Sequence, residues 1–326
     1  MKKSGRLILV LFLAAAFCAV SLNHARADYP DRPLTLIVVF GPGGATDLAS
    51  RALGKALEKR LGQPILVVNK PGGGSAVGAA AIASAKPDGY TFGTTLWTTV
   101  ALLPHTVDVP YSIDSFDYIM INGGYRFGIA VKSDSKFKTL KELTDYAKQN
   151  PGKIKYSTTG ATVPGNVGMI LLGKAAGVQW ENVVFKSGAE AATAVLGGHV
   201  DATSANPIDV IPFIEAGRMR LLTSLSDKRW KWVPDVPSIR ELGYDFHVNA
   251  YMGYGAPKGV PKAALEKLRE AFKEASRDPE FLANLEKFYT IPESITGDEY
   301  RRLLIEESKM NEKFLLEFGL HKSQKK

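Results

Sequence analysis

The segment Leu34-Thr-Leu-Ile-Val-Val-Phe40 is followed by Gly41-Pro-Gly-Gly-Ala-Thr-Asp47 and by Leu48-Ala-Ser-Arg-Ala-Leu53. This order predicts a buried strand, a glycine-rich loop and the start of an amphipathic helix. Such a loop gathers backbone N–H groups at the positive end of a helix, which is an anion-binding geometry. It has neither the Gly-Lys-Ser/Thr of a nucleotide P-loop nor Gly-x-Gly-x-x-Gly spacing. Two interpretations stay open, an anion site or a tight turn without a ligand.

The N-terminus indicates export. Lys2, Lys3 and Arg6 precede an apolar run over residues 7–22, and Ala25-Arg26-Ala27 follows as a small-x-small cleavage site. This pattern predicts a signal peptide over residues 1–27, cleaved after Ala27, and therefore a periplasmic protein. An uncleaved membrane anchor is the alternative, but the apolar run is short for a membrane span.

The mature chain has no cysteine, because Cys18 lies within the apolar run. Disulfides, thiol catalysis and cysteine-ligated metals are therefore excluded, and stability must come from the core. The net charge of +8 falls to +4 when the four cations of residues 1–27 are removed. A mild positive charge without a basic-aromatic motif does not predict nucleic-acid binding, and it suits the capture of small anions.

Beyond Phe40 the chain alternates predicted strands and helices, which implies largely parallel sheets, and its length favours two lobes. Polar loops follow several strands, at Pro71–Ser75, Thr158–Asn166, Ser187–Ala189 and Ser204–Pro207. In open α/β sheets, ligands bind beyond the carboxyl ends of the strands. If the two lobes face each other, these loops line one cleft, and their N–H and hydroxyl groups suit a carboxylate.

Catalytic and metal motifs are not evident in the sequence. His105, His199, His247 and His321 have no metal-ligand spacing, and there is no Gly-x-Ser-x-Gly elbow. Asp47 is open to two interpretations, a catalytic carboxylate or a helix N-cap. We therefore expect no enzyme activity, no cofactor and no metal.

Further motifs make the chain similar to the TctC/Bug family of periplasmic solute-binding proteins, the receptors of tripartite tricarboxylate transporters. The motifs extend over nearly all of the mature chain, and their order and spacing together are specific. They are Tyr29-Pro-Asp-Arg-Pro33, Val67-Val-Asn-Lys-Pro-Gly-Gly-Gly74, Ala85-Lys-Pro-Asp-Gly-Tyr-Thr91, Leu196-Gly-Gly-His-Val-Asp201 and Pro234-Asp-Val-Pro237.

The resemblance implies a two-lobed, type II-like periplasmic binding protein. Each lobe is expected to be a mainly parallel sheet flanked by helices, with strands crossing between the lobes. The implied limits are residues 28–124 with about 254–300 for lobe 1, residues 125–253 for lobe 2, and a C-terminal helix over 297–318 that packs across both lobes.

The resemblance also implies which residues hold the ligand. One loop in each lobe grips a carboxylate, and less uniform positions set the specificity. The first loop contributes Gly43, Gly44, Ala45, Thr46 and Asp47. The second loop contributes Thr159, Gly160, Ala161, Thr162, Gly165 and Asn166. The positions expected to set specificity are Trp97, Tyr125, Arg126, Phe127, Ser187 and Asn206.

This chain departs from the family pattern at Leu96-Trp97-Thr98, at Tyr125-Arg126-Phe127 and at Val163-Pro164-Gly165-Asn166, where relatives usually have Ser-Pro-Gln-His. These changes suggest a bulkier or flatter ligand, with Arg126 available for a second anionic group. In the alternative interpretation, Trp97 and Phe127 are lobe packing and Arg126 is a surface charge.

Two functions are consistent with this sequence. In the favoured one, a monomeric receptor delivers a di-, tri- or aromatic carboxylate to the membrane subunits of a tripartite transporter. In the other, the ligand-loaded protein signals to a membrane sensor kinase.

Overall fold

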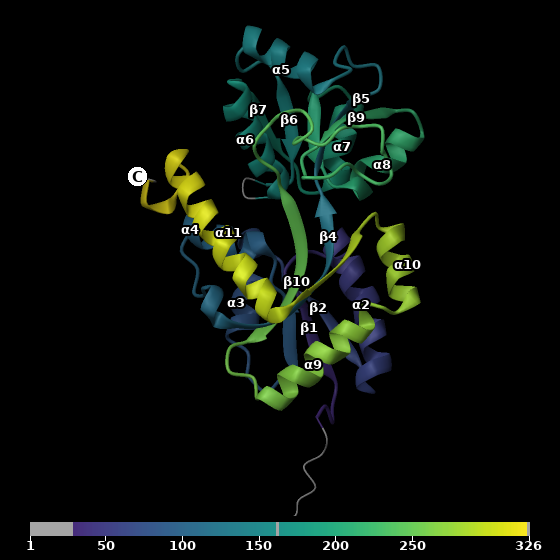
Figure 1. The fold of residues 1–326 in the computed structure, drawn as a ribbon, viewed down its shortest axis with the longest axis vertical. Helices are drawn as coiled ribbons and strands as arrows, with labels where there is room; N and C mark the ends of the chain where they lie inside the picture. The colour runs from purple at the N-terminus through teal and green to yellow at the C-terminus, as the bar shows by residue number, and fades with distance from the viewer. Residues whose placement is uncertain (1–28, 161–162, 325–326) are drawn as a thin grey trace, which may run out of the picture.

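The computed structural model describes residues 29–160 and 163–324. These residues form two α/β lobes that lie one above the other and are joined by two long strands, β4 and β10 (Figure 1). The expected signal peptide lies outside the described residues. Within them, we find no helix whose length and hydropathy would let it cross a membrane.

Lobe 1, the lower lobe in Figure 1, is built on a six-stranded sheet. In spatial order its strands are β11 (Ile291–Thr296), β4 (Phe116–Arg126), β10 (Asn249–Pro257), β3 (Thr91–Thr94), β1 (Leu34–Val38) and β2 (Ile65–Asn69). Its helices are α2 (Ala45–Leu61), α3 (Ala76–Ala83), α4 (Leu103–Thr106), α9 (Lys262–Ala275), α10 (Pro279–Lys287) and α11 (Gly297–Glu317).

Lobe 2 is built on a five-stranded sheet. In spatial order its strands are β7 (Glu181–Val184), β6 (Lys155–Thr158), β8 (Ala202–Ala205), β5 (Gly128–Lys132) and β9 (Met219–Ser224). Its helices are α5 (Leu140–Gln149), α6 (Pro164–Ala176), α7 (Gly188–Leu196) and α8 (Pro207–Glu215).

Both sheets are mixed rather than mainly parallel. In lobe 1, β1 pairs in parallel with β2 and β3, whereas β10 runs antiparallel to β3 and β4. In lobe 2, β6 pairs in parallel with β7 and β8, whereas β5 runs antiparallel to β8 and β9. The reason is the path of the chain. It enters lobe 2 along β4 and returns along β10, so this pair must run in opposite directions.

Local sequence signals explain the elements that carry the predicted loops. All of β1 except Thr35 is buried, which anchors the strand that leads into the first glycine loop. The helix after that loop, α2, ends at Gly62, whose φ of 67° gives a left-handed C-cap. In lobe 2, Thr139 and Glu142 form a capping box at the start of α5.

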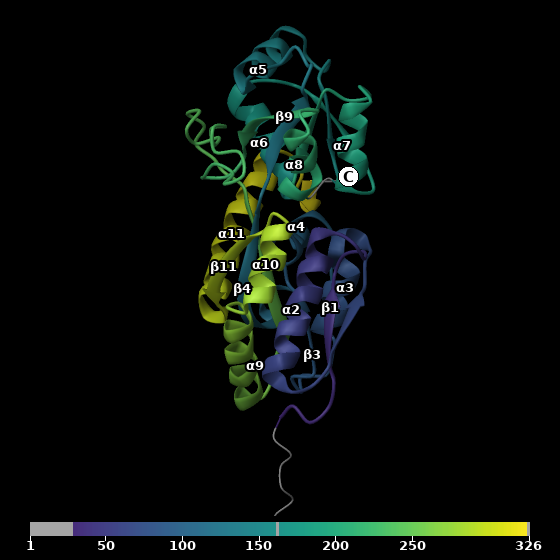
Figure 2. The ribbon, with the colours of Figure 1, turned by 90° about the vertical axis from the view of Figure 1, so that its right-hand side faces the viewer.

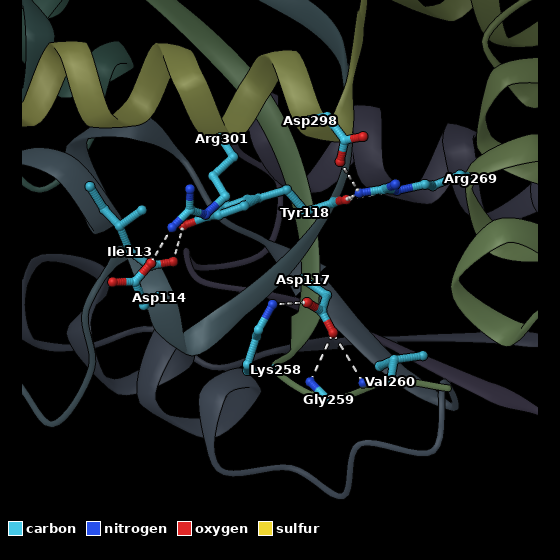
Figure 3. A network of polar contacts seen from close by, with 10 residues as sticks. All are labelled: Ile113, Asp114, Asp117, Tyr118, Lys258, Gly259, Val260, Arg269, Asp298 and Arg301. Carbon is cyan, nitrogen blue, oxygen red and sulfur yellow. Dashed lines mark hydrogen bonds and ion pairs between the residues drawn. The ribbon is translucent and has the colours of Figure 1, made fainter. Parts of the chain in front are cut away.

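A polar network fixes the lobe 1 end of both crossover strands (Figure 3). Asp117 at the start of β4 accepts hydrogen bonds from the backbone N–H groups of Gly259 and Val260, at 2.8 and 3.0 Å, just after β10. From α9, the Arg269 guanidinium donates to the Tyr118 carbonyl oxygen at 2.8 Å. These hydrogen bonds hold the start of β4 against the segment that follows β10 and against α9.

The C-terminal helix α11 lies along lobe 1, against β4, β11 and α4 (Figures 1 and 2). Near its end it also reaches lobe 2, where Lys174 of α6 pairs with Glu317 and lies 4.6 Å from the ring centre of Phe318. The sheet of lobe 1 includes all of β4 and β10. The residue limits given above for the lobes stay a prediction.

Candidate functional site

The first glycine loop lies between β1 and α2, at the edge of lobe 1 that faces lobe 2. Gly43 has a φ of 83°, a conformation that favours glycine, and Gly44 is the N-cap of α2. No side chain caps α2, so its first N–H groups have no side-chain partner. Gly43 and Gly44 are exposed, and Ala45 is half-buried. This loop therefore presents free backbone donors on the side where the lobes meet.

Asp47 holds this loop together and is not the N-cap of α2. Its buried carboxylate accepts hydrogen bonds from the Gly43 N–H at 2.8 Å, from Asn69 Nδ2 at 2.8 Å and from Arg51 Nε at 3.1 Å. Burial alone would raise the pKa of Asp47, but the hydrogen bonds from Arg51, Gly43 and Asn69 lower it below its ordinary value. Asp47 is thus an ionised residue that positions the loop.

Thr46 connects this loop to the crossover strand β4. It is buried, and its hydroxyl lies within hydrogen-bond reach of Tyr125, near the end of β4. The Tyr125 hydroxyl also donates to the Met252 sulfur of β10 at 3.0 Å. Burial raises the pKa of Tyr125, with a smaller contribution from the charge of Asp209 at the start of α8. Tyr125 therefore joins the first glycine loop to both crossover strands.

The second predicted loop follows β6 and leads into α6 in lobe 2. Thr159 is exposed and Gly160 is half-buried, while Ala161 and Thr162 lie outside the described residues. No side chain caps α6, whose N-cap is Val163. The side chain of Asn166 is buried and accepts a hydrogen bond from the Tyr156 hydroxyl at 2.8 Å. The start of α6 offers few backbone donors, because Pro164 has no N–H and the Asn166 N–H donates to the Val163 carbonyl oxygen at 3.0 Å.

Phe127 packs against the start of α6. A methyl group added at Gly165 would lie 2.7 Å from Phe127 Cδ1 and 2.8 Å from Ser204 Oγ. The Ser204 hydroxyl donates to the Gly165 carbonyl oxygen at 3.0 Å. Only glycine fits this contact, and the buried Phe127 ring packs against the second loop. A contact of Phe127 with a ligand stays a prediction.

Arg126 points away from Tyr125, because successive side chains of a strand lie on opposite faces. Arg126 is 6% exposed, and its guanidinium pairs with Glu293 of β11 at 3.3 Å, while Nε and Nη1 have no partner among the described residues. Its role in binding a second carboxylate stays a prediction, and the ion pair with Glu293 competes with that role.

Trp97 follows β3 and is the N-cap of a short π-helix, η2 (Thr98–Leu102). The side chain is 5% exposed, and its indole N–H is buried without a hydrogen-bond partner among the described residues. Leaving such a donor unpaired costs about 1–3 kcal/mol. The indole N–H is therefore a candidate donor for a ligand, although the core residue Trp230 also has a buried N–H without a partner among the described residues.

Ser187 and Asn206 end the loops that lead into α7 and α8. The Ser187 hydroxyl caps α7 by accepting from the Glu190 N–H at 3.2 Å. Asn206 is the N-cap of α8, although its side chain does not cap the helix, and its Oδ1 is buried without a partner among the described residues. Asp209, three residues later, is half-buried beside Asn206. Asp209 has no distinctive sequence signal, because an acid in the first turn is an ordinary feature of a helix.

Two histidines that are distant in the sequence come together beside α11, with ring centres 5.8 Å apart. His105 of α4, Glu312 of α11 and His321 present ligand-type atoms within 4.8 Å of one another.

A separate surface groove of about 850 Å³ lies beside α7. Its lining includes Phe185, His199 and Phe213 and contains none of the predicted ligand residues.

Comparison with known proteins identifies the family. The model of the tripartite tricarboxylate transporter family receptor, TctC, matches residues 49–320. The chain belongs to this family. The TctC receptors are periplasmic solute-binding proteins and not enzymes, which confirms that expectation from the sequence.

Individual relatives resemble this TctC receptor over nearly its whole length. A Cupriavidus necator protein, named UPF0065 protein in the gbd 5′ region, is 35% identical, with 96% of this chain and 97% of that protein covered. A solved periplasmic transporter is 29% identical, with a TM-score of 0.81 and coverage of 90% and 99%. MatC from Rhodopseudomonas palustris, solved with bound malate, is 26% identical, with a TM-score of 0.78 and coverage of 87% and 99%. The two-lobed fold expected from the resemblance is therefore confirmed.

Proposed function

We propose that this receptor binds one small organic carboxylate between its lobes and delivers it to the membrane subunits of a tripartite tricarboxylate transporter. The observation that supports this most is the arrangement around Tyr125. A glycine loop with free N–H groups contacts Tyr125 of the crossover strand β4 through Thr46. Helix α8 lies at the side of lobe 2 that faces lobe 1 (Figure 2). Free helix N-termini are favourable partners for a carboxylate.

The malate bound by MatC supports a carboxylate as the ligand of this chain. Cleavage after Ala27 and release into the periplasm are part of the same proposal, since the family is periplasmic. The alternative of signalling to a sensor kinase would use the same ligand site. Transport uptake measured in cells with and without the gene separates these two roles.

A thermal-shift screen tests the proposed ligand class. The purified mature protein is heated with mono-, di-, tri- and aromatic carboxylates, and with uncharged amides of the same acids as controls. An acid present at 100 times its dissociation constant adds about 2.7 kcal/mol of stability, which is a shift of several degrees for a protein of this size. Equal melting temperatures with every acid and with buffer alone contradict the proposal.

A further inference from the structure

Asp209 places a carboxylate among loops that are built for an anion. It lies in the first turn of α8, directly against the first residue of α7. A methyl group added at Gly188 would lie 2.1 Å from Asp209 Oδ2 and 2.3 Å from Oδ1, so the space that Asp209 occupies exists only because residue 188 is glycine. Helices α7 and α8 begin at the edge of lobe 2 that faces lobe 1 (Figure 2).

No cation neutralises Asp209 in residues 29–160 and 163–324, where its hydrogen-bond contacts are with the backbone and side chain of Asn206. Burial raises the pKa of Asp209 to about 6, and the Asn206 contacts offset this only in part. The group is therefore mostly ionised at neutral pH. Its charge reaches Tyr125, where it helps to raise the pKa of the phenol.

A negative charge at this place would repel a second carboxylate of a ligand. It would attract a hydrogen-bond donor, and an ammonium group most strongly, because that group offers three N–H donors and a positive charge. Two acceptors lie next to each other here: the Asp209 carboxylate, which is hydrogen-bonded to the Asn206 side chain, and the buried Asn206 Oδ1, which has no partner among the described residues.

We propose that Asp209, with Asn206, binds the ammonium group of a zwitterionic amino-carboxylate, whose carboxylate is held by the glycine loops. This inference rests on the proposed carboxylate function. It narrows the ligand to acids that carry an amino group.

Matched acids measured by calorimetry at pH 7.5 test this assignment. One series is aspartate, malate and succinate, and the other is phenylalanine, phenyllactate and phenylpropionate. One of the two series should bind measurably. In that series, we expect the amino acid to bind at least tenfold more tightly than its hydroxy and unsubstituted analogues. Asp209→Asn should reduce the affinity for the amino acid at least tenfold and leave that for the unsubstituted acid within twofold or improve it.

The control is Asp134→Asn, which removes the same charge from an exposed turn of lobe 2 after β5 and should leave all affinities unchanged. If an unsubstituted or hydroxy acid binds as tightly as the amino acid, or if Asp209→Asn weakens all acids equally, the inference is wrong while the carboxylate function stands. If no carboxylate of any kind binds, the proposed function fails first.

A second observation carries an independent inference about the histidine cluster of lobe 1. His105 and Glu312 come from α4 and α11, and His321 lies just beyond α11. Both rings have a serine partner. His105 Nε2 lies 2.8 Å from Ser308 Oγ, and His321 Nδ1 lies 2.7 Å from Ser323 Oγ and also accepts from the Ser323 N–H at 3.2 Å. Metal-binding histidines commonly donate a hydrogen bond from their second ring nitrogen, and the Ser308 hydroxyl can accept one from His105.

We infer that His105, Glu312 and His321 bind one Zn²⁺ ion, with water as the fourth ligand. Two imidazoles and a carboxylate suit tetrahedral zinc, and their separation of up to 4.8 Å closes with small rotations, since Glu312 is exposed. The ion would tie the segment after α11 to α4.

Calorimetry with Zn²⁺ and visible absorption with Co²⁺ on the tag-free mature protein test this site. We expect one ion per chain, a tetrahedral Co²⁺ spectrum, and loss of both in His105→Ala and in His321→Ala. His199→Ala, which removes a histidine of lobe 2, should bind normally. Absence of saturable binding in the wild-type protein, or binding that persists in both cluster variants, overturns the inference.

Discussion

Asp47 shows how one buried carboxylate holds a loop in place through its hydrogen bonds. Its hydrogen bonds fix Gly43 and Arg51 of its own loop and helix, and Asn69 at the end of β2. The free N–H groups of the loop therefore keep their direction in the absence of a ligand. Such preorganisation lowers the entropy that binding must offset.

Asp47→Asn should weaken ligand binding and lower the free energy of unfolding, by about 1–3 kcal/mol at pH 7, because hydrogen bonds to a buried charge are lost. The pKa of Asp47 is lowered in the folded state, so its contribution is present above the unfolded pKa of about 3.9 and is lost as the pH falls through the folded pKa. Urea unfolding at pH 7 and below pH 4 should show the difference from wild type becoming smaller.

The matched control for Asp47 is Asp117→Asn, which also removes a carboxylate that holds two backbone N–H groups, but at the base of lobe 1. It should cost stability without changing affinity. Unchanged affinity in Asp47→Asn would show that Asp47 only stabilises the fold.

Trp97→Phe removes the unpaired indole N–H and keeps an aromatic ring. If this N–H donates to the ligand, affinity should fall about 2- to 10-fold, the worth of one hydrogen bond, with little loss of stability. Trp230→Phe is the control, because the Trp230 N–H is also buried without a partner in the described part of the chain, in the core of lobe 2. Calorimetry that gives equal affinities for wild type and Trp97→Phe would assign Trp97 to packing.

The position of the first glycine loop could be predicted from the sequence, whereas the contacts of individual side chains in β4 could not. Glycines and the helix start after them were enough to predict the loop that contains Thr46. The strand period could have separated Arg126 from Tyr125, but the pairing with Glu293 depends on β11, which is distant in the sequence. Asp209 could not be singled out from the sequence, because its carboxylate packs against Gly188 only in the folded chain.

At the scale of elements, the site depends on how helices start at strand ends. Helices α2 and α6 begin after β1 and β6 without a side-chain cap. By contrast, Thr139, Asp278 and Thr296 cap α5, α10 and α11 with their side chains. Alternating strands and helices predicted these starts. They did not predict the antiparallel strands β10 and β5, whose direction is set by the chain crossing between lobes.

Gly165→Ala tests the contact that positions α6. The added methyl group would clash with Phe127 and Ser204, so α6 must shift, and we expect a loss of about 1–3 kcal/mol of stability together with weaker binding. Gly160→Ala is the milder control, since its nearest neighbour would lie at 3.4 Å. Equal melting temperatures and affinities for the two variants would contradict this role of Gly165.

At the scale of the whole molecule, the crossover strands join two lobes that also contact each other at their sides. Trp232 of lobe 2 donates to Glu286 of α10 at 3.1 Å and packs edge-on against Tyr289, with ring centres 5.3 Å apart. On α11, Glu317 pairs with Lys174. These pairs are exposed and individually weak, so they permit the lobes to move. Proteins of two lobes joined by a few strands commonly close around their ligand.

Small-angle scattering of the mature protein, with and without the acid that stabilises it most in the thermal-shift screen, tests the central claim most directly. If loops of both lobes hold the carboxylate, the bound state is more closed, and the radius of gyration should decrease at saturation. The uncharged amide of the same acid is the control and should leave the curve unchanged. Superimposable curves for the free and the saturated protein would contradict binding between the lobes.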